Sequence, residues 1–485
     1  MRRSVKALAF VLTLPIIVAA LGLLGHARWE SRWDPWLERQ VAMQRALPFR
    51  GLLMRPTLSD VCADERIGSR FPPCATYSLF SRATAGAAIV GGAGLAFLGG
   101  LLLAGQLCRG SRRWMVALLR PALFATALGV ACLGVAHGLL AAAGLAVGAG
   151  ALWFQPAERI SGPLQVAALA GGLGWALAMA TAVFSLIRRP TISLVGQMLD
   201  LREQARLADL LRTVSASVGA EPPENVVVCL VPWLFVTGMD VTCLDRRLSG
   251  RTLCLSLSLA RILSVDELRG QLAHELAHYS REQAPFTTRV ASPLIGVSRA
   301  MHEAAGRVRG FRAVVWAAPL ALLSVLIAEA TGGGALRGDW ERSADEAAAS
   351  VAGREAFASG LVKLAAFTPA WHAVFALMQS AAYSDTQYAN VSAMFQEIAA
   401  SSAGDDRLTG VDRMVQGHPI DRHATLGERV AALGLQSGDV AEAALSVVLQ
   451  QPATSLIDGC KEIEERLSTA EHQLIVETGG RIPRG

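Results

Sequence analysis

Four long apolar stretches constrain the fold of this chain more than any other feature of its sequence. They are Ala7 to Gly25, Ala85 to Leu107, Leu118 to Phe154 and Leu164 to Ile187, and each reaches the roughly 20 residues that a helix needs to cross a bilayer core. Inside a bilayer the backbone polar groups must be paired within the segment, so we expect helices. The composition agrees, since 52% of residues are hydrophobic, 18% are charged and the mean hydropathy is +0.38. The sequence predicts an integral membrane protein.

The character of the sequence changes after Arg188, where charged residues reach ordinary density. We therefore expect a helical membrane domain over residues 1–189, with about four transmembrane helices and an external loop over 28–84. A mostly helical α+β domain with a small antiparallel sheet should follow over 190–435, and a helical tail over 436–485.

Basic residues predict the topology, because short cytoplasmic segments carry an excess of Lys and Arg. They form three clusters: Arg2, Arg3 and Lys6; Arg109, Arg112, Arg113 and Arg120; Arg188 and Arg189. With these inside, the chain makes four crossings and its second half is cytoplasmic, at the cell (inner) membrane. Alternatively, Leu118 to Phe154 folds as two helices that turn near His137 and Gly138. Five crossings would leave Arg188 and Arg189 outside, so we favour four.

Two features of the membrane half leave alternatives open. Cys62 and Cys74 lie in the expected external loop, where they either form a disulfide or stay as two free thiols. Trp29, Trp33 and Trp36 recur at helical spacing, which is typical of a helix lying at the membrane surface; simple anchoring is favoured over a ligand site.

A further apolar run, from Val314 to Ala330, is at the lower length limit for a crossing and contains Pro319 and Glu329. It is expected to be a buried helix or one that dips into the bilayer, and it is not counted as a crossing.

The segment His274-Glu275-Leu276-Ala277-His278 is the HExxH pattern of zinc hydrolases. Ser264 and Glu267 form a predicted capping box, so the segment should be helical. Histidines four residues apart then share one face and can bind one Zn²⁺, with Glu275 beside them as general base. The alternative is a surface helix whose histidines bind nothing.

Short strands are expected before this helix, and a substrate chain could add to their sheet as an extra strand. A break at Pro222 and Pro223 separates them from an amphipathic helix predicted over Val195 to Val218. The predicted strands are Val226 to Val231, Leu234 to Thr237, Val241 to Leu244 and Thr252 to Leu257.

Two histidines leave a catalytic zinc one protein ligand short. The best candidate for the third is Glu341, in an alanine-rich helical segment that places Asp345 on the same face. Asp345 would orient a ligand, most plausibly His274. An ordinary charged surface helix is the alternative.

Together these motifs resemble the HtpX-like and CAAX-prenyl-endopeptidase-like membrane zinc metallopeptidases, whose fold is zincin-like. The resemblance covers about residues 222–433 and rests on five elements in order: Phe235, Asp266 to Leu268, His274 to His278, Glu341 with Asp345, and His423 to Arg429. It implies that His423 and Arg429 steady the site or the developing oxyanion. Two departures stand out, since Trp233 replaces an Asn and Ala424 replaces the Pro after the late histidine. His418, before Pro419, is the runner-up for the role of His423.

The resemblance implies a membrane-anchored zinc endopeptidase acting on protein or peptide substrates, either prenylated proteins or misfolded membrane proteins under quality control. A membrane metalloprotease-type signal transducer and a non-catalytic scaffold are the alternatives. An intramembrane active site is disfavoured by the charges that flank the motif, such as Asp266, Arg269 and Glu282. The net charge of +5 gives no indication of nucleic-acid binding, and no feature indicates an oligomeric state.

Overall fold

The computed structural model describes residues 2–42, 57–154, 191–291 without 245, 311–331, 335–402 without 385 and 425–478, with parts of 166–181 and 293–301. The chain forms two compact units. The first comprises Met1–Arg188 and Met301–Gly332, and the second comprises Arg189–Ala300 and Gly333–Gly485. The apolar segment 301–332 therefore belongs with the N-terminal helices, although the second unit flanks it in sequence.

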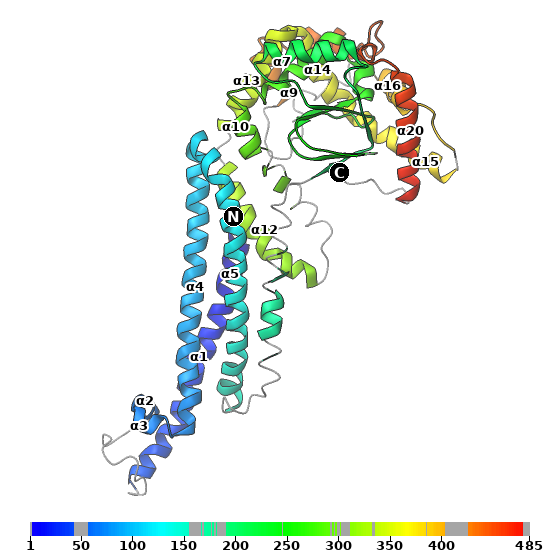
Figure 1. Cartoon of the computed structure of the whole chain (residues 1–485). Coiled ribbons are helices and arrows are strands. Elements are labelled where there is room, and N and C mark those ends of the chain that lie inside the picture. Colours follow the sequence, from blue (N-terminus) through cyan, green and yellow to red (C-terminus); the bar gives the residue numbers. More distant parts are fainter. Residues whose placement is uncertain are drawn as a thin grey trace. The chain divides into compact units, whose positions relative to one another are not determined.

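Long apolar helices make up the first unit (Figure 1). α1, α4 and α5 contact one another, and α12 contacts all three. At the contact of α4 with α12, a Cβ on Gly105 would collide with the Cβ of Glu329. Only glycine permits this close approach. The described helices are α1 (Arg2–Ala42), α2 (Leu58–Ala63), α3 (Glu65–Gly68), α4 (Pro72–Gly110), α5 (Arg112–Trp153) and α12 (Phe311–Thr331).

The first three predicted membrane stretches are confirmed as parts of α1, α4 and α5, which are long and apolar enough to cross a bilayer. α5 runs without a break through His137 and Gly138. The alternative, in which this stretch folds as two helices, is therefore not observed. The fourth stretch, Leu164 to Ile187, lies mostly outside the described residues. These helices indicate insertion in a membrane.

Arg354–Tyr383 is a further segment that is long and apolar enough to cross, and the sequence reasoning missed it. It comprises α14 (Arg354–Phe367), a 3₁₀ turn η4 (Thr368–Ala370) and α15 (Trp371–Tyr383). Phe357, Phe367 and Met378 lie in the hydrophobic core of the second unit, which accounts for much of the segment's apolar character.

A disulfide joins Cys62 of α2 to Cys74 near the start of α4, with the two Cα atoms 5.2 Å apart. The alternative of two free thiols is therefore not what the structure contains.

The tryptophans of α1 pack against other parts of the first unit, with Trp29 buried and Trp33 and Trp36 half-buried, so they do not form the free stripe expected of a helix lying on the membrane surface. Trp29 is 3% exposed, and its Nε1–H donates to the Gly150 carbonyl over 2.9 Å. The rings of Trp33 and Trp36 pack edge-on and stacked, respectively, against Phe71. Helical spacing alone cannot distinguish a lipid-facing stripe from one covered by α2, α3 and α4.

The second unit combines short strands with helices. Its described elements are β1 (Ile192–Ser193), β2 (Gly196–Met198), α7 (Ala205–Ser217), β3 (Asn225–Cys229), β4 (Leu234–Thr237), β5 (Val241–Cys243), β6 (Arg246–Leu248), β7 (Thr252–Ser256), α8 (Leu257–Ile262), α9 (Val265–Ala277), α10 (Ala284–Phe286), the π-helical turn η3 (Thr287–Ala291), α13 (Ala335–Ala352), α14, η4, α15, α16 (Val391–Ser401), α18 (Leu426–Ala432), η6 (Ser437–Val440), α19 (Ala441–Leu445), η7 (Ala453–Leu456) and α20 (Cys460–Glu477).

The strands form a sheet in the order β2-β3-β7-β4 and a smaller one in the order β1-β5-β6. The β3–β7 and β1–β5 pairs are parallel and the other pairs antiparallel, so the sheets are mixed. The predicted fold class is confirmed, with this refinement. The β2 strand corrects the helix predicted over Val195 to Val218, which begins only at Ala205. Pairing with β3 (Gly196 opposite Cys229) overrides the local helical pattern.

A buried ion pair fixes the start of α9. Glu267 Oε2 accepts hydrogen bonds from the Ser264 N–H at 2.7 Å and from Lys363 Nζ of α14 at 2.9 Å. Its other oxygen accepts a hydrogen bond from Ser359 Oγ at 2.6 Å. The charged groups thus satisfy one another, which a buried carboxylate requires. These contacts anchor α9 to α14, and the HExxH motif lies at the far end of α9.

Candidate metal centre

α9 places His274 and His278 on one face, as the four-residue spacing predicts. The predicted capping box is present, since Ser264 Oγ accepts from the Glu267 N–H while the Glu267 carboxylate accepts from the Ser264 N–H. Each histidine is 7% exposed. The ring centroids lie 4.9 Å apart, and the ring planes are inclined by 83°. The capped helix therefore presents two buried imidazoles to one position.

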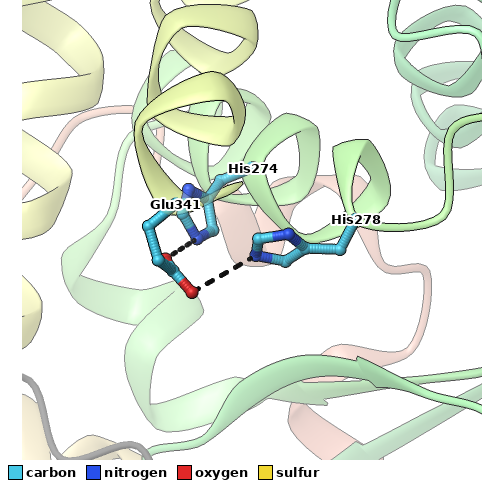
Figure 2. Close-up of side chains that lie close together, drawn as sticks. All are labelled: His274, His278 and Glu341. Carbon is cyan, nitrogen blue, oxygen red and sulfur yellow. Dashed lines mark ion pairs between the residues drawn. The ribbon is translucent and has the colours of Figure 1, made fainter. Parts of the chain in front are cut away.

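α13 brings Glu341 to the two histidines (Figure 2). Glu341 Oε2 lies 3.4 Å from His274 Nε2, and Glu341 Oε1 lies 3.9 Å from His278 Nε2. The three ligand atoms lie within 4.8 Å of one another. Ligand atoms around a tetrahedral zinc, each about 2.0–2.1 Å from the ion, are separated by roughly 3.3 Å. The donor set and its spacing therefore fit a zinc ion with only small movements.

His274 is held by an acidic partner that is itself paired. Its Nδ1 lies 2.8 Å from Asp345 Oδ1, although the N–H direction departs from good hydrogen-bond geometry. Arg429 of α18 donates hydrogen bonds to both oxygens of Asp345, from Nε to Oδ2 over 2.9 Å and from Nη2 to Oδ1 over 2.6 Å. Asp345 and Arg429 are 5% and 6% exposed. This arrangement fixes the ring so that Nε2 faces Glu341.

Burial and neighbouring charges shift the pKa values of His274 and Asp345. Burial lowers the pKa of His274, but Asp345 and Glu341 outweigh it and raise the pKa to about 10 when no metal is bound. Burial raises the pKa of Asp345, whereas His274 and Arg429 lower it to about 2. Asp345 therefore remains a carboxylate at neutral pH, which favours a fixed orientation of the His274 ring.

His278 has different neighbours. Its Nδ1 lies 3.4 Å from Gln283 Oε1, and Gln283 Nε2 donates to Ser343 Oγ at 3.0 Å. The indole of Trp340 stacks on its ring, with centroids 3.8 Å apart and planes inclined by 27°. Sequence reasoning missed both residues. Trp340 directly precedes Glu341, but nothing in the sequence indicates that its ring turns toward His278.

Glu275 is partly exposed and lies beside the edge strand β4. Its Oε2 accepts a hydrogen bond from the Val236 N–H at 3.2 Å. Burial raises the pKa of Glu275 to about 7, while His274 and the Val236 N–H act to lower it. Tyr279, the residue after the motif, donates to the Val236 carbonyl at 3.3 Å. The potential base and the edge of the sheet are thus fixed to each other.

Comparison with known proteins now decides the family. Residues 203–433 match peptidase family M48, the family of HtpX and of CAAX prenyl protease zinc metallopeptidases. This region is an M48 peptidase domain. No curated protein and no solved structure matches the chain.

The M48 match confirms the resemblance inferred from the motifs at residues 222–433. It starts shortly before α7 and ends at Leu433, just after α18, so it contains His274, His278, Glu341 and Arg429. With the apolar helices of the first unit, the match supports a membrane-associated metallopeptidase.

The structure brings together most of the residues that the sequence singled out. His274, Glu275, His278, Glu341, Asp345 and Arg429 form one group in the second unit. Arg429 contacts Asp345, which in turn lies beside His274. His423 and its runner-up His418 lie outside the described residues. Trp233, which replaces the expected Asn, precedes β4 and is 37% exposed.

Proposed function

We propose that this M48 protein is a zinc endopeptidase that cleaves extended segments of protein substrates at a membrane. The observation that carries the proposal is the gathering of His274, His278 and Glu341 within 4.8 Å, with Glu275 on the same helix. Two imidazoles and one carboxylate are a known protein ligand set of catalytic zinc. Four-coordinate zinc with three protein ligands keeps one position open for water or substrate.

Each residue has a distinct proposed role. Zinc in this site would polarise the scissile carbonyl and lower the pKa of the attacking water. Glu275 would accept the proton of that water and deliver it to the leaving amine. Asp345, gripped by Arg429, would keep the His274 ring oriented, and His423 would assist at the developing oxyanion as the resemblance implies.

The substrate is proposed to be an extended polypeptide beside β4. β4 lies at the edge of the sheet order and is fixed to Glu275 through Val236. An edge strand offers backbone hydrogen bonds to an added chain without selecting a sequence. Such recognition suits unfolded or misfolded proteins, so we propose membrane-protein quality control as the biological role.

The catalytic unit is proposed to lie on the cytoplasmic side of the inner membrane. Two observations support this. The Cys62–Cys74 disulfide favours an oxidising compartment for the turn between α1 and α4. Arg109, Arg112 and Arg113 lie at the other end of α4, where the positive-inside rule predicts the cytoplasm.

Metal dependence tests this proposal. The full chain, purified in detergent, should cleave unfolded casein, lose the activity with 1,10-phenanthroline and regain it with added Zn²⁺. The His278→Ala variant, prepared in the same way, controls for contaminating proteases and should be inactive. Cleavage that persists in the chelator or in His278→Ala would contradict the proposal. A scaffold or a ligand-gated transducer would bind zinc yet leave casein intact.

A further inference from the structure

The two histidines of the site are held by different kinds of partner. His274 faces the Asp345 carboxylate, which Arg429 grips, whereas the partners described above for His278 are a neutral amide and an indole face. Ligand histidines usually need a partner for the ring atom that does not face the metal. The orientation of the His278 ring must therefore come from its own neighbours.

The amide of Gln283 is oriented by its second partner. Gln283 is 7% exposed, and its Nε2 donates to Ser343 Oγ. With Nε2 on the hydroxyl, the oxygen of the amide lies 3.4 Å from His278 Nδ1, and an amide oxygen can only accept. The proton of the neutral ring is thereby kept on Nδ1, which leaves the lone pair of Nε2 toward Glu341.

The indole of Trp340 covers the face of the same ring. Trp340 is 9% exposed and is backed by Phe286, whose ring centroid lies 5.6 Å away. A near-parallel stack at 3.8 Å blocks rotation of the imidazole and excludes water from one face. An electron-rich indole face also favours positive charge on its neighbour, as on an imidazole that ligates a cation.

Both contacts depend on the helix that carries the third ligand. Trp340 and Ser343 flank Glu341 in α13, while Gln283 follows α9 closely in sequence. We propose that Trp340 and Gln283 are positioning residues for His278, so that docking of α13 orients the second ligand while it delivers the third. The inference rests on the proposed function only in taking His278 as a metal ligand.

The test measures metal affinity instead of hydrolysis. Zinc Kd is determined by chelator competition for the full chain in detergent, and Co²⁺ absorption reports the geometry of the site. Trp340→Leu keeps an apolar side chain without the π face, and Gln283→Leu removes the acceptor for Nδ1. Each should raise the zinc Kd by about 10-fold or more, in the range found for partners of metal ligands, and should change the Co²⁺ spectrum. Trp340→Phe retains a ring and should recover part of the affinity.

Trp371→Leu is the matched control. Trp371 lies in the same unit and packs on Phe395, so its loss should lower the thermal midpoint without changing the zinc Kd. The double variant Trp340→Leu/Gln283→Leu should lose less affinity than the product of the single losses, because both act through one ring. Wild-type zinc affinity in both single variants would overturn the inference. If the wild-type chain binds no zinc, the proposed function itself fails, which is a separate result.

Discussion

At the scale of single residues, the site is a set of charges that satisfy one another. Arg429 binds both oxygens of Asp345, and Asp345 faces His274. A buried ion pair of this kind adds little to the free energy of unfolding. Removing one partner lowers that free energy strongly, because the other charge stays buried without a counter-charge. The carboxylate and the guanidinium are therefore expected to act as one unit.

Substitution of Arg429 tests this reading. Arg429→Ala should lower the free energy of unfolding by about 3–5 kcal/mol, the usual cost of breaking a buried pair. The zinc Kd should rise about 10-fold, because Asp345 no longer orients His274. Arg429→Lys keeps the charge but loses the two-point grip, so intermediate effects are expected. Thermal unfolding and chelator competition measure both quantities. If Arg429 acted at the reacting carbonyl alone, kcat would fall while zinc affinity stayed unchanged.

The sequence predicts the residues of this site better than their contacts. The spacing of His274 and His278 and the need for a third ligand point to Glu341, because metal chemistry restricts residue type and position. The contacts of Trp340 and Gln283 with His278 follow no such rule, since they depend on how α13 packs against α9. Side-chain contacts between distant segments leave little trace in a single sequence.

At the scale of elements, α9 is predictable and β2 is not. The capping box of Ser264 and Glu267 is a local signal, so the start of α9 can be read from a few residues. β2 exists because Gly196–Met198 pair with β3, about thirty residues away, and the periodicity of the segment suggested a helix instead. Local signals thus predict helices that carry their own caps, while strands need partners that the sequence does not name.

Glu471 of α20 provides a test of element packing through pH. It is 8% exposed, and burial raises its pKa from the ordinary 4.5 to about 7. The folded state therefore binds the proton of Glu471 more tightly than the unfolded state does. The stability contributed by this proton is fully present below pH 4.5 and is lost as the pH rises through 7. The shift corresponds to about 3 kcal/mol. Glu471→Gln should match the wild type near pH 4.5 and exceed it by up to about 3 kcal/mol at pH 8.

Thermal midpoints of the full chain and of Glu471→Gln at the two pH values give this comparison. The difference between the proteins isolates Glu471, because the other titrating groups are common to both. An equal difference at both pH values would show that the carboxyl of Glu471 does not titrate in this range.

At the scale of the whole molecule, a segment of the first unit separates the residues of the candidate metal site in the sequence. His278 precedes residues 301–332 and Glu341 follows them, yet both contribute to one group. The chain between them must leave and return on the same side of the bilayer. We therefore expect an even number of crossings between His278 and Glu341, so that α12 would not cross the bilayer alone.

Labelling of introduced cysteines tests the topology. The exposed residues Glu65, Glu282 and Glu346 are replaced one at a time by Cys, in a chain whose exposed thiol Cys132 is replaced by Ser. An impermeant maleimide should label positions 282 and 346 from one side of sealed vesicles and position 65 from the other. Labelling of 282 and 346 from opposite sides would contradict a shared metal site, and labelling of 65 from their side would contradict the proposed orientation.

The most direct test of the central claim is the Glu275→Gln variant, with zinc content and casein cleavage measured on the same preparation. Glu275 is proposed to move the proton and not to hold the metal. The variant should therefore retain about one zinc per chain, like the wild type, while cleavage falls by at least 100-fold. Normal cleavage by zinc-loaded Glu275→Gln would contradict the account.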